Sequence, residues 1–520
     1  MSNLNCASLP RGWARVRLRD VVRPVRPKVL PSDFPNLRFV GMEHIEAQTT
    51  RLLATVEASS MKSSAVHFQP GDILYGRLRP YLNKVHFSEF AGLCSAEFIV
   101  LTPYAGIDAR FIRSLLNSWP FVSFASGLNA GIDRPRVDFE GITSYELAIP
   151  PSAEQRRIVE KIDSLLSKLD AAGAALKRAR ANLKRYRASV LKAAIEGRLV
   201  PTEAELARKE GRDFEPASVL LDLILDERRR RWEESEFARM KAVGKPPKDD
   251  RWKSHYKAPP APATAGLPEI PEGWAYTMMP ALMLPSGQGM KTGPFGTLLQ
   301  KCEHRLDGVP VIGIENIEPL RFVWGSKIHI TPEKASDLAG YDLKRGDLII
   351  SRSGTVGDVC VVPDNIGAAR FSTNVMRIRF LCGAPIPQFI AVLLNGSPFV
   401  LSQISKLCRG TTRDFLNQRI LSAIALPIPP LYEQHRILQE IDRQLSVARA
   451  IEDYLAASET RCGRLRQCIL KWAFEGRLVD QDPNDEPASV LLERMRGERG
   501  AAAKPVKHRD PIVRETEAAK

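Results

Sequence analysis

Two long stretches of the chain carry the apolar pattern of a coiled-coil helix. Apolar residues recur at alternating steps of four and three over residues 158–190, and the same register returns over residues 437–469. This alternation is the heptad signature of a helix seam. Each helix, of about 44 residues, would span roughly 65 Å at about 1.5 Å per residue. The predicted seam includes three positions far from the helix starts, namely Tyr186, Ile451 and Leu465.

Proline and glycine residues mark the ends of both predicted helices. A proline pair precedes each one, at Pro150–Pro151 and at Pro429–Pro430. Gly197 and Gly476 follow the last apolar position, where a left-handed residue commonly ends a helix. The two helices therefore have defined starts and stops, which a long charged surface helix would not need.

The stretch before each helix is predicted to be a mixed α/β unit. Short apolar runs typical of strands alternate with Gly/Pro turns, among them "DILYG", "EFIVLTP", "DLIIS" and "VMRIRFL". Helices are expected at Ala109–Asn117 and at Pro387–Leu394. The Lys- and Pro-rich stretch 244–265 is expected to be an exposed linker.

Several segments occur twice, in the same order. "IPPSAEQRRIVEKID" starts at Ile149, and "IPPLYEQHRILQEID" starts at Ile428. "EGRLV" and "EPASVLL" each occur twice as well, and a proline, one residue and "GW" stand at 10–13 and at 271–274. The chain is therefore a tandem duplication. The helical segments remain closer to one another than the globular ones, which indicates one shared helical role and two different globular roles.

The shared register favours pairing of the two helices within one chain, antiparallel, over homodimerisation through a surface coiled coil. The expected fold class is α/β (α+β), with two tandem units, two long helices in an antiparallel coiled coil and an internal pseudo-twofold duplication. Such helices would hold the units at a fixed separation. The expected segments are a first α/β unit, its helical region, the linker, a second α/β unit, its helical region and a charged, disordered tail, at residues 1–151, 152–243, 244–265, 266–430, 431–496 and 497–520.

The charge and hydropathy of the chain indicate which kind of molecule it binds. The formal net charge of +15 attracts polyanions, of which nucleic acid is the commonest in the cytosol. No apolar run reaches a membrane-spanning length, and the N-terminus lacks the pattern of a secretory signal, so a cytoplasmic protein without membrane contact is expected. The eight cysteines are scattered without a CxxC pair, which predicts reduced thiols and no zinc site.

Motifs for catalysis are missing from the sequence. There is no GxxxxGK[ST] phosphate loop, no FxGxG turn for a methyl donor and no [DNS]PP[YFW] motif of amino-methyltransferases. Ser351 and Asp364 lack the neighbouring partners that a nucleophile or a nuclease would need. The chain is therefore predicted to recognise a target rather than to transform it, with no catalytic residue and no metal ligand.

Four loops carry residue types that suit DNA. Arg bonds bidentately to guanine, Asn to adenine, and Ser or Thr hydroxyls bond to phosphate. The alternative is that these are solvated turns or helix caps. The candidates in the first unit are Arg77, Arg79, Lys84, Asn129, Arg134 and Arg136. Those in the second unit are Ser351, Arg352, Ser353, Thr355, Arg409, Thr411, Thr412, Arg413 and Asn417.

The chain resembles the specificity subunit of type I restriction-modification systems over about residues 9 to 495. The resemblance rests on "L-x-IPP-x-x-EQ-x-RI" at 147–158 and 426–437, on "EGRLV", and on "GDILYGRLRPYL" and "GDLIISRSGTVG". It implies two target-recognition domains, each reading one half of a bipartite DNA site, and a pair of helices that sets the spacer. The differing loops "YGRLRPYLNK" and "ISRSGTVGDV" then predict two different half-sites.

The resemblance also implies partners. Two modification subunits would dock around the helices and methylate adenine, and two restriction subunits would complete an ATP-driven nuclease on double-stranded DNA. S-adenosylmethionine, ATP and Mg²⁺ would belong to those partners, with no cofactor in this chain. The EQ-x-RI residues are expected at the domain–helix junction and partner surface: Glu154, Gln155, Arg157, Glu433, Gln434 and Arg436.

Three other interpretations remain open on the sequence. The chain could be a recognition subunit of a different methyltransferase or phage-defence assembly. It could be a self-contained methyltransferase or nuclease, against which the missing motifs argue. A purely structural coiled-coil protein would leave the basic loops and the divergent paired units unexplained.

Overall fold

The computed structural model describes residues 9–25, 27–128, 134–263, 266–285, 287–352, 357–381, 386–408 and 416–502, with side chains described as far as residue 498. The chain divides into two compact units. Unit 1 comprises residues 1–178 and 455–520, and unit 2 comprises residues 179–454. Each long helix contributes residues to both units, so that each unit combines parts from the two halves of the sequence.

Unit 1 is built on three sheets. Its first and last strands pair antiparallel, β1 (Ala14–Arg17) with β11 (Glu146–Ile149). The four-stranded sheet has the order β2 (Val22–Val25), β10 (Phe98–Pro103), β7 (Ile73–Gly76) and β8 (Val85–Phe87). The five-stranded sheet has the order β3 (Lys28–Val29), β6 (Ala65–Phe68), β9 (Gly92–Ser95), β4 (Arg38–Val40) and β5 (Val56–Glu57). The helices beside them are α1 (Ala109–Leu116), α2 (Trp119–Gly127) and α3 (Phe139–Thr143).

Unit 2 repeats the core of this topology. Its first and last strands again pair antiparallel, β12 (Ala275–Met278) with β22 (Ala425–Ile428). The four-stranded sheet has the equivalent order β13 (Met290–Thr292), β21 (Val375–Ile378), β18 (Leu348–Ser351) and β19 (Val359–Val361). A three-stranded sheet comprises β17 (Ile328–Ile330), β14 (Val309–Ile312) and β20 (Arg370–Phe371), and β15 (Ile317–Glu318) pairs with β16 (Arg321–Phe322). Its short helices are α7 (Met279–Leu282), α8 (Pro332–Asp337), α9 (Ile386–Gly396), α10 (Pro398–Cys408) and α11 (Gln418–Ser422).

The predicted elements of both α/β units are confirmed. The four strand-like runs form β7, β10, β18 and β21, and the two expected helices form α1 and α9. Every residue of β7, β18 and β21 is buried, because these central strands have neighbours on both edges and packing on both faces. Asp108 starts α1 by accepting hydrogen bonds from the backbone amides of Arg110 and Phe111.

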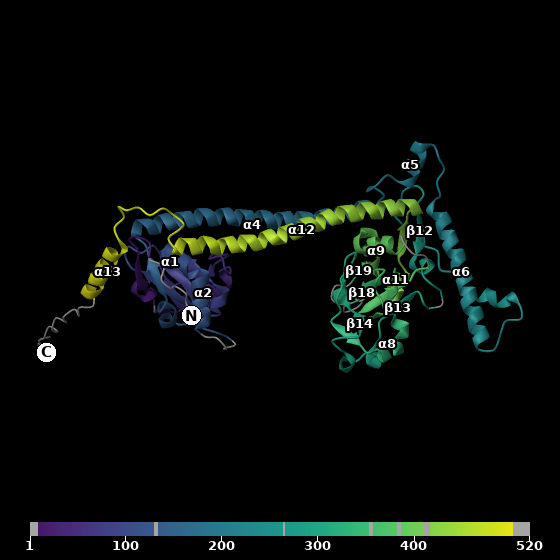
Figure 1. The fold of residues 1–520 in the computed structure, drawn as a ribbon, viewed down its shortest axis with the longest axis horizontal. Coiled ribbons are helices and arrows are strands. Elements are labelled where there is room, and N and C mark those ends of the chain that lie inside the picture. The colour runs from purple at the N-terminus through teal and green to yellow at the C-terminus, as the bar shows by residue number, and fades with distance from the viewer. Residues whose placement is uncertain are drawn as a thin grey trace, which may run out of the picture. The chain divides into compact units, whose positions relative to one another are not determined.

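The two long helices are also confirmed. Helices α4 (Ser152–Ile195) and α12 (Leu431–Phe474) contain 44 residues each (Figure 1). Gly197 and Gly476 follow them with φ of 64° and 68°. The next amide reaches back to close a Schellman motif at each end, from Arg198 to the carbonyl of Ala193 at 2.8 Å in the first copy. Three further helices complete the helical regions, namely α5 (Glu203–Glu210), α6 (Ala217–Ala242) and α13 (Ala488–Ala502).

The long helices run antiparallel within each unit. In unit 1, Ile158 near the start of α4 shares a buried core with Ile469 near the end of α12. In unit 2, Val190 near the end of α4 shares a core with Ile437 near the start of α12. The start of one helix therefore meets the end of the other in both units, as the intramolecular pairing predicts.

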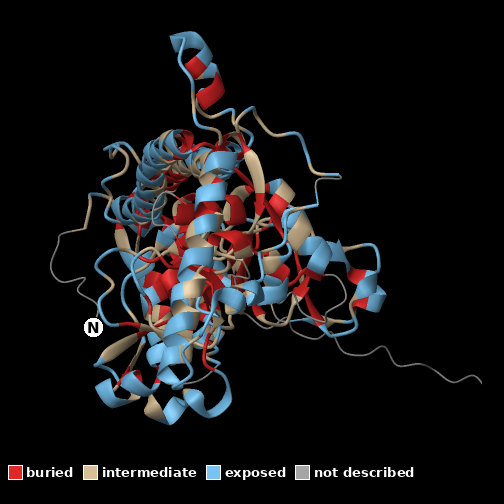
Figure 2. Ribbon diagram, turned by 90° about the vertical axis from the view of Figure 1, so that its right-hand side faces the viewer, coloured by how far each residue is buried: buried red, intermediate tan, exposed pale blue. Residues whose placement is uncertain are grey.

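The seam departs from the strict heptad prediction away from the helix ends. Tyr186, Ile451 and Leu465 are each 44% exposed. Beside Ile451, Glu452 pairs instead with Arg187 at 2.8 Å. A strict seven-residue pattern drifts by about 20° per heptad on a straight helix, so a predicted stripe leaves the contact line unless the helices supercoil. Buried residues are concentrated in the α/β cores (Figure 2), and most residues in the middle of the long helices are exposed or half-buried.

The stretch predicted as a linker contains local structure. Residues Asp250–His255 form a 3-10 helix, and Trp252 stacks on Trp232 of α6 with ring centroids 5.9 Å apart. Tyr256 also accepts a hydrogen bond from Arg228 of α6 at 3.0 Å. Within the predicted tail, α13 continues to Ala502, and the remaining residues lie outside the described part of the chain.

Within the described ranges, no single helix is long and apolar enough to cross a membrane. Helices α9 and α10, bent by 67° at their break, pass the test of length and composition as a pair. The apolar residues of α9 are buried in the core of unit 2, which accounts for their hydropathy.

Replacing Gly197 by Ala should destabilise unit 2 by more than the left-handed backbone alone explains. A Cβ atom at this position would lie 2.5 Å from Cγ of Pro271, so overpacking of on the order of 1–3 kcal/mol adds to a backbone cost of about 1–2 kcal/mol. Gly211→Ala is the matched control, because Gly211 has φ of 67° and nothing within 4 Å of the added atom. Denaturant unfolding measures both, and equal losses would contradict the close contact.

Candidate nucleic-acid interface and helix junctions

Two of the predicted DNA-binding loops of unit 1 lie side by side. The chain leaves β7 at Gly76, and the following loop bonds to the segment that ends in Val137. The amide of Arg79 donates to the carbonyl of Pro135 at 2.8 Å, and the amide of Val137 donates to the carbonyl of Arg77 at 3.0 Å. A β-bridge between Leu78 and Arg136 completes this junction. The loops that carry Arg77, Arg79, Arg134 and Arg136 therefore form one surface.

The basic side chains of this surface differ in what holds them. Arg79 and Arg134 are exposed. Arg136 is exposed too, but its guanidinium pairs with Glu97 at 2.7 Å. Lys84 is half-buried, and its Nζ donates to the carbonyl of Met42 at 2.6 Å, which ties the end of the loop to the 3-10 turn Met42–His44. Asn129 lies outside the described residues.

In unit 2 the equivalent loop leaves β18 at Ser351, which is fully buried. Arg352 is only 5% exposed, and its Nε donates to the carbonyl of Leu416 at 3.4 Å. Its guanidinium also lies 5.2 Å from the ring centroid of Phe295, and burial lowers the pKa of Arg352. Arg352 therefore connects the end of β18 to the segment before α11. In unit 1, backbone hydrogen bonds make the equivalent connection between the loop after β7 and the segment before α3.

The remaining candidates of unit 2 flank this contact. Asn417 is exposed, and its side chain caps α11 by accepting from the amide of Ile420 at 3.0 Å. Asp138 caps α3 in the same way in unit 1. The other candidates lie outside the described residues, namely Ser353, Thr355, Arg409, Thr411, Thr412 and Arg413. In both units, therefore, the residues that follow the equivalent strand (β7 or β18) bond to the segment before the last short helix, and the sequences there differ.

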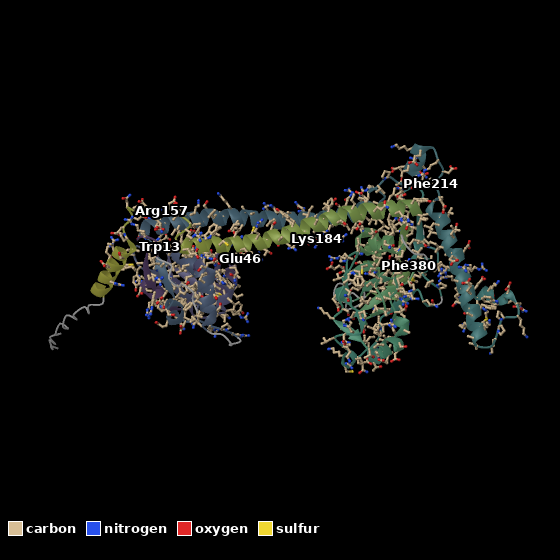
Figure 3. The ribbon with its side chains drawn as sticks, viewed as in Figure 1. Trp13, Glu46, Arg157, Lys184, Phe214 and Phe380 are labelled. Atoms are coloured by element: carbon tan, nitrogen blue, oxygen red, sulfur yellow. The ribbon has the colours of Figure 1, made fainter. Side chains whose placement is uncertain are left out.

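The six EQ-x-RI residues lie where the long helices leave the α/β units. In unit 1, Glu154 is 1% exposed and accepts a hydrogen bond from Nε1 of Trp13 at 3.0 Å. Gln155 is fully buried and bonds to the amide of Asp108 at 2.9 Å. Arg157 forms an ion pair with Asp485 at 2.7 Å. Figure 3 shows Trp13 and Arg157 at this end of unit 1.

The junction of unit 2 repeats this arrangement, except that its arginine pairs with a different acidic residue. Glu433 is fully buried and accepts from Nε1 of Trp274 at 2.8 Å. Gln434 is equally buried and donates to the carbonyl of Pro429 at 2.9 Å. Arg436 pairs with Glu203 of α5 at 2.6 Å. The first helical region contains α5 where the second has the loop that carries Asp485. The arginine of each junction therefore forms its ion pair with an acidic residue from a different element.

The repeated segments exchange partners between the two halves. The amide of Ala488, in the second "EPASVLL", donates to the carbonyl of Gly12 at 2.8 Å. The amide of Ala217, in the first "EPASVLL", donates to the carbonyl of Gly273 at 2.8 Å. Each "GW" motif is therefore bound by the helical segment of the other copy. Sequence reasoning found the motifs but missed this exchange, together with the roles of Trp13, Trp274, Asp485 and Glu203.

The junction carboxylates have shifted pKa values. Burial raises the pKa of Glu154, although the hydrogen bond from Trp13 opposes the shift. Burial raises the pKa of Glu433 as well. Burial acts in the same direction on Glu203, but hydrogen bonds and charges from Arg212 and Arg436 outweigh it and lower the pKa of Glu203. Among the described residues, no group of three or more His, Cys, Asp or Glu side chains is placed to hold a metal ion.

Comparison with known proteins identifies the family. The model of the type I restriction modification DNA specificity domain matches residues 10–177 and 296–452, which together make up more than half of the chain. The chain belongs to this family. The two matched ranges give the chain two specificity domains in tandem, and we call them the first and second specificity domain.

The specificity chain is similar to subunits of known restriction enzymes. It is 22% identical over 535 residues to the specificity subunit of the StySPI enzyme of Salmonella potsdam, which covers 96% of this chain and 98% of that protein. Its identity to the EcoBI specificity subunit of Escherichia coli is 25%, over 68% of this chain and 65% of that protein. The chain is 27% identical to the E. coli EcoDI specificity subunit, over 38% of this chain and 44% of that protein. The matched part is thus less than two thirds of the EcoDI and EcoBI subunits.

A solved structure supports the fold. The specificity chain aligns over 91% of its length with a chain from a structural description of complex assembly and conformational transition in the type I R-M system. The TM-score is 0.63 at 18% sequence identity, and the alignment covers 100% of that chain. At this identity the likeness shows a shared fold.

Replacing Glu154 by Gln should change how stability depends on pH. The raised pKa means that the folded chain holds this proton at pH values where the unfolded chain, near 4.5, has released it. Stability from this group therefore falls as pH rises from about 4.5 through the raised pKa. The neutral amide keeps an acceptor for Trp13 and does not titrate, so the melting temperature of E154Q relative to that of the wild type should rise as the pH increases above about 4.5.

The matched control is Glu160→Gln, at an exposed position of the same helix. The melting temperature of E160Q should stay close to that of the wild type, because the substitution is at an exposed position. A difference between E154Q and the wild type that stays constant as the pH increases above about 4.5 would contradict the linkage.

Proposed function

We propose that this chain is the DNA-binding specificity subunit of a type I restriction-modification complex, in which each specificity domain recognises one half of an asymmetric bipartite site. The observation that carries the proposal is a common scaffold with different loops. The loop after β7 contains Arg77 and Arg79, and the loop after β18 contains Arg352 in the equivalent place. A shared sheet can present both loops alike, whereas their different side chains would select different bases.

The described candidate residues divide between two proposed roles, contact with DNA and support of the loops. Exposed Arg79, Arg134 and Arg136 of the first domain are proposed to contact DNA, with Arg77 and Lys84 supporting the loop. Arg352 and Asn417 are proposed to organise the loops of the second domain. The EQ-x-RI residues are proposed to fix the junction and to shape a partner surface, because the buried Glu and Gln side chains hold the start of each helix while the side chains of Arg157 and Arg436 stay 36% and 30% exposed.

The proposed partners supply the chemistry. Two modification subunits would dock on the helical regions and carry S-adenosylmethionine, and two restriction subunits would carry ATP and Mg²⁺. The chain itself acts in this scheme by binding DNA and positioning the other subunits. The segment boundaries proposed for these roles are 1–151 and 266–430 for target recognition, with 152–243 and 431–496 as helical regions.

The alternative is a DNA-recognition subunit of another methyltransferase or phage-defence assembly. It would use the same loops and helices with other catalytic partners. The genes beside this one discriminate the two, because a type I system requires separate modification and restriction subunits.

The first test is a methylation map. The chain is produced with the modification subunit encoded beside it in a host without such systems, and methylated adenines are located by sequencing the DNA. The expected result is a new asymmetric motif in two parts that is absent without this chain. No new motif from a soluble, associated pair of proteins would contradict the proposal, and a motif produced by this chain alone would show that it is itself a methyltransferase.

Lengthening both long helices should lengthen the spacer and leave both half-sites unchanged. Arg466 pairs with Asp170 in unit 1, so an insertion after Ala172 in α4 is matched by one after Gly463 in α12. Seven residues add about 10.5 Å of helix, which corresponds to roughly three base pairs of DNA. The methylation motif measures the change.

The control for this experiment places the same seven residues after Gly244, in an exposed loop beyond α6. The motif should then stay as it is in the wild type. Altered half-sites in the helix variant, or an unchanged spacer, would contradict the role of the helices in setting the separation.

A further inference from the structure

Two loops of the first specificity domain hold an unusual concentration of left-handed backbone. Among the described residues, five non-glycine residues have positive φ, and four of them lie in the loops 46–51 and 77–84. Backbone of this kind is costly for side-chain-bearing residues, and it persists only where surrounding contacts impose it. Such residues gather at ligand-binding sites. The four are Gln48 (69°), Thr50 (65°), Arg79 (52°) and Asn83 (49°).

Hydrogen bonds join these two loops to each other. The amide of Gln48 donates to the carbonyl of Asn83 at 3.2 Å. The side-chain Nε2 of Gln48 donates to the carbonyl of Tyr81 at 2.8 Å. The loop 46–51, which begins at Glu46 (Figure 3), therefore supports the turn between Arg79 and Asn83 from outside. Sequence reasoning did not single out this loop.

Asn83 connects the turn to the rest of the domain. It is 2% exposed, and its Nδ2 donates to the carbonyl of Asn117 at the end of α1, at 3.0 Å. The same Nδ2 lies 3.4 Å from Oε1 of Gln48. Its own amide closes the 3-10 turn Pro80–Leu82 by donating to the carbonyl of Pro80 at 2.9 Å. One buried side chain thus joins the turn, the loop 46–51 and helix α1.

The turn that Asn83 holds exposes side chains suited to DNA. Tyr81 is 48% exposed and Arg79 is exposed, and Trp119, 66% exposed, starts α2, which packs against the turn. Arg can recognise guanine or phosphate, and an exposed aromatic ring can pack against sugar or base. A turn fixed at both ends before binding loses little conformational freedom when it meets DNA.

In the described part of the second specificity domain, a glycine stands in the place of Asn83. Gly357 stands two residues before β19, just as Asn83 stands two residues before β8, and it has φ of 95°. Glycine permits the left-handed turn but offers no side chain to bond with neighbours. Asn83 therefore offers side-chain hydrogen bonds at a place where both domains have positive φ.

We propose that Asn83 and Gln48 are positioning residues for DNA recognition by the first specificity domain, and that they fix the turn from which Arg79 and Tyr81 contact its half-site. This inference rests on the proposed function. Asn83 acts through the turn from a buried position. Gln48 acts through its bond to the carbonyl of Tyr81, and neither residue needs to touch a base.

The test compares methylation motifs of the full chain produced with its modification subunit. Asn83→Gly keeps the left-handed turn and removes the side-chain bonds, whereas Asn83→Asp keeps the shape and removes the donor to Asn117. In both variants one half-site, the same one each time, should relax. The share of methylated sites with a non-cognate base there should rise about tenfold, while the other half-site and the spacer stay unchanged. A residue that served stability alone would relax neither half-site selectively.

Lys62→Ala is the matched control, because it removes an exposed charge of the same domain away from the turn, and its motif should equal that of the wild type. An unchanged motif in both Asn83 variants, or equal relaxation of both half-sites, would overturn the inference. If neither Asn83 variant folds, the motif of Gln48→Ala is measured instead, and the same half-site should relax. Gln48 is exposed, so this substitution leaves the core intact. A wild-type chain that directs no bipartite methylation would overturn the proposed function itself, which is a distinct result.

Discussion

A buried glutamate that accepts a hydrogen bond from a tryptophan indole secures each long helix to its α/β domain. Glu154 receives this bond from Trp13, and Glu433 receives it from Trp274. A buried carboxylate is costly without such partners, so the bond constrains the first turn of the helix to one position against the first strand of the domain. The direction in which each helix leaves its domain depends on this contact.

The same junctions join the two halves of the sequence. Each "GW" motif lies between the start of one long helix and the "EPASVLL" segment that follows the other, and an Arg–acid pair closes each junction, Arg157 with Asp485 and Arg436 with Glu203. Substitution at any of these segments would disturb two others in the same unit. This mutual dependence gives a physical reason why the helical segments of the two copies remain alike within one chain.

The loops that follow β7 and β18 are under a different constraint. The four-stranded sheets share one strand order, so the loops after β7 and β18 leave equivalent positions. The first domain fixes its loop with asparagine, glutamine and left-handed backbone, whereas the described residues at the corresponding place in the second domain are Gly357 and the buried Arg352. A common sheet with independently varied loops is the arrangement that two different half-sites in one DNA target would require.

Much of this protein follows from its sequence. Heptad spacing, proline pairs and terminal glycines define the ends of α4 and α12, and apolar runs define β7, β10, β18 and β21, because these patterns reflect local backbone geometry and burial. The duplicated motifs also establish the tandem organisation. Tertiary structure alone decided which copies of the motifs meet, why Ile451 and Leu465 leave the seam, and which loop residues are exposed. Those outcomes depend on contacts between residues far apart in the chain, such as Gly12 with Ala488 and Gln48 with Asn83, and no local pattern encodes such pairs.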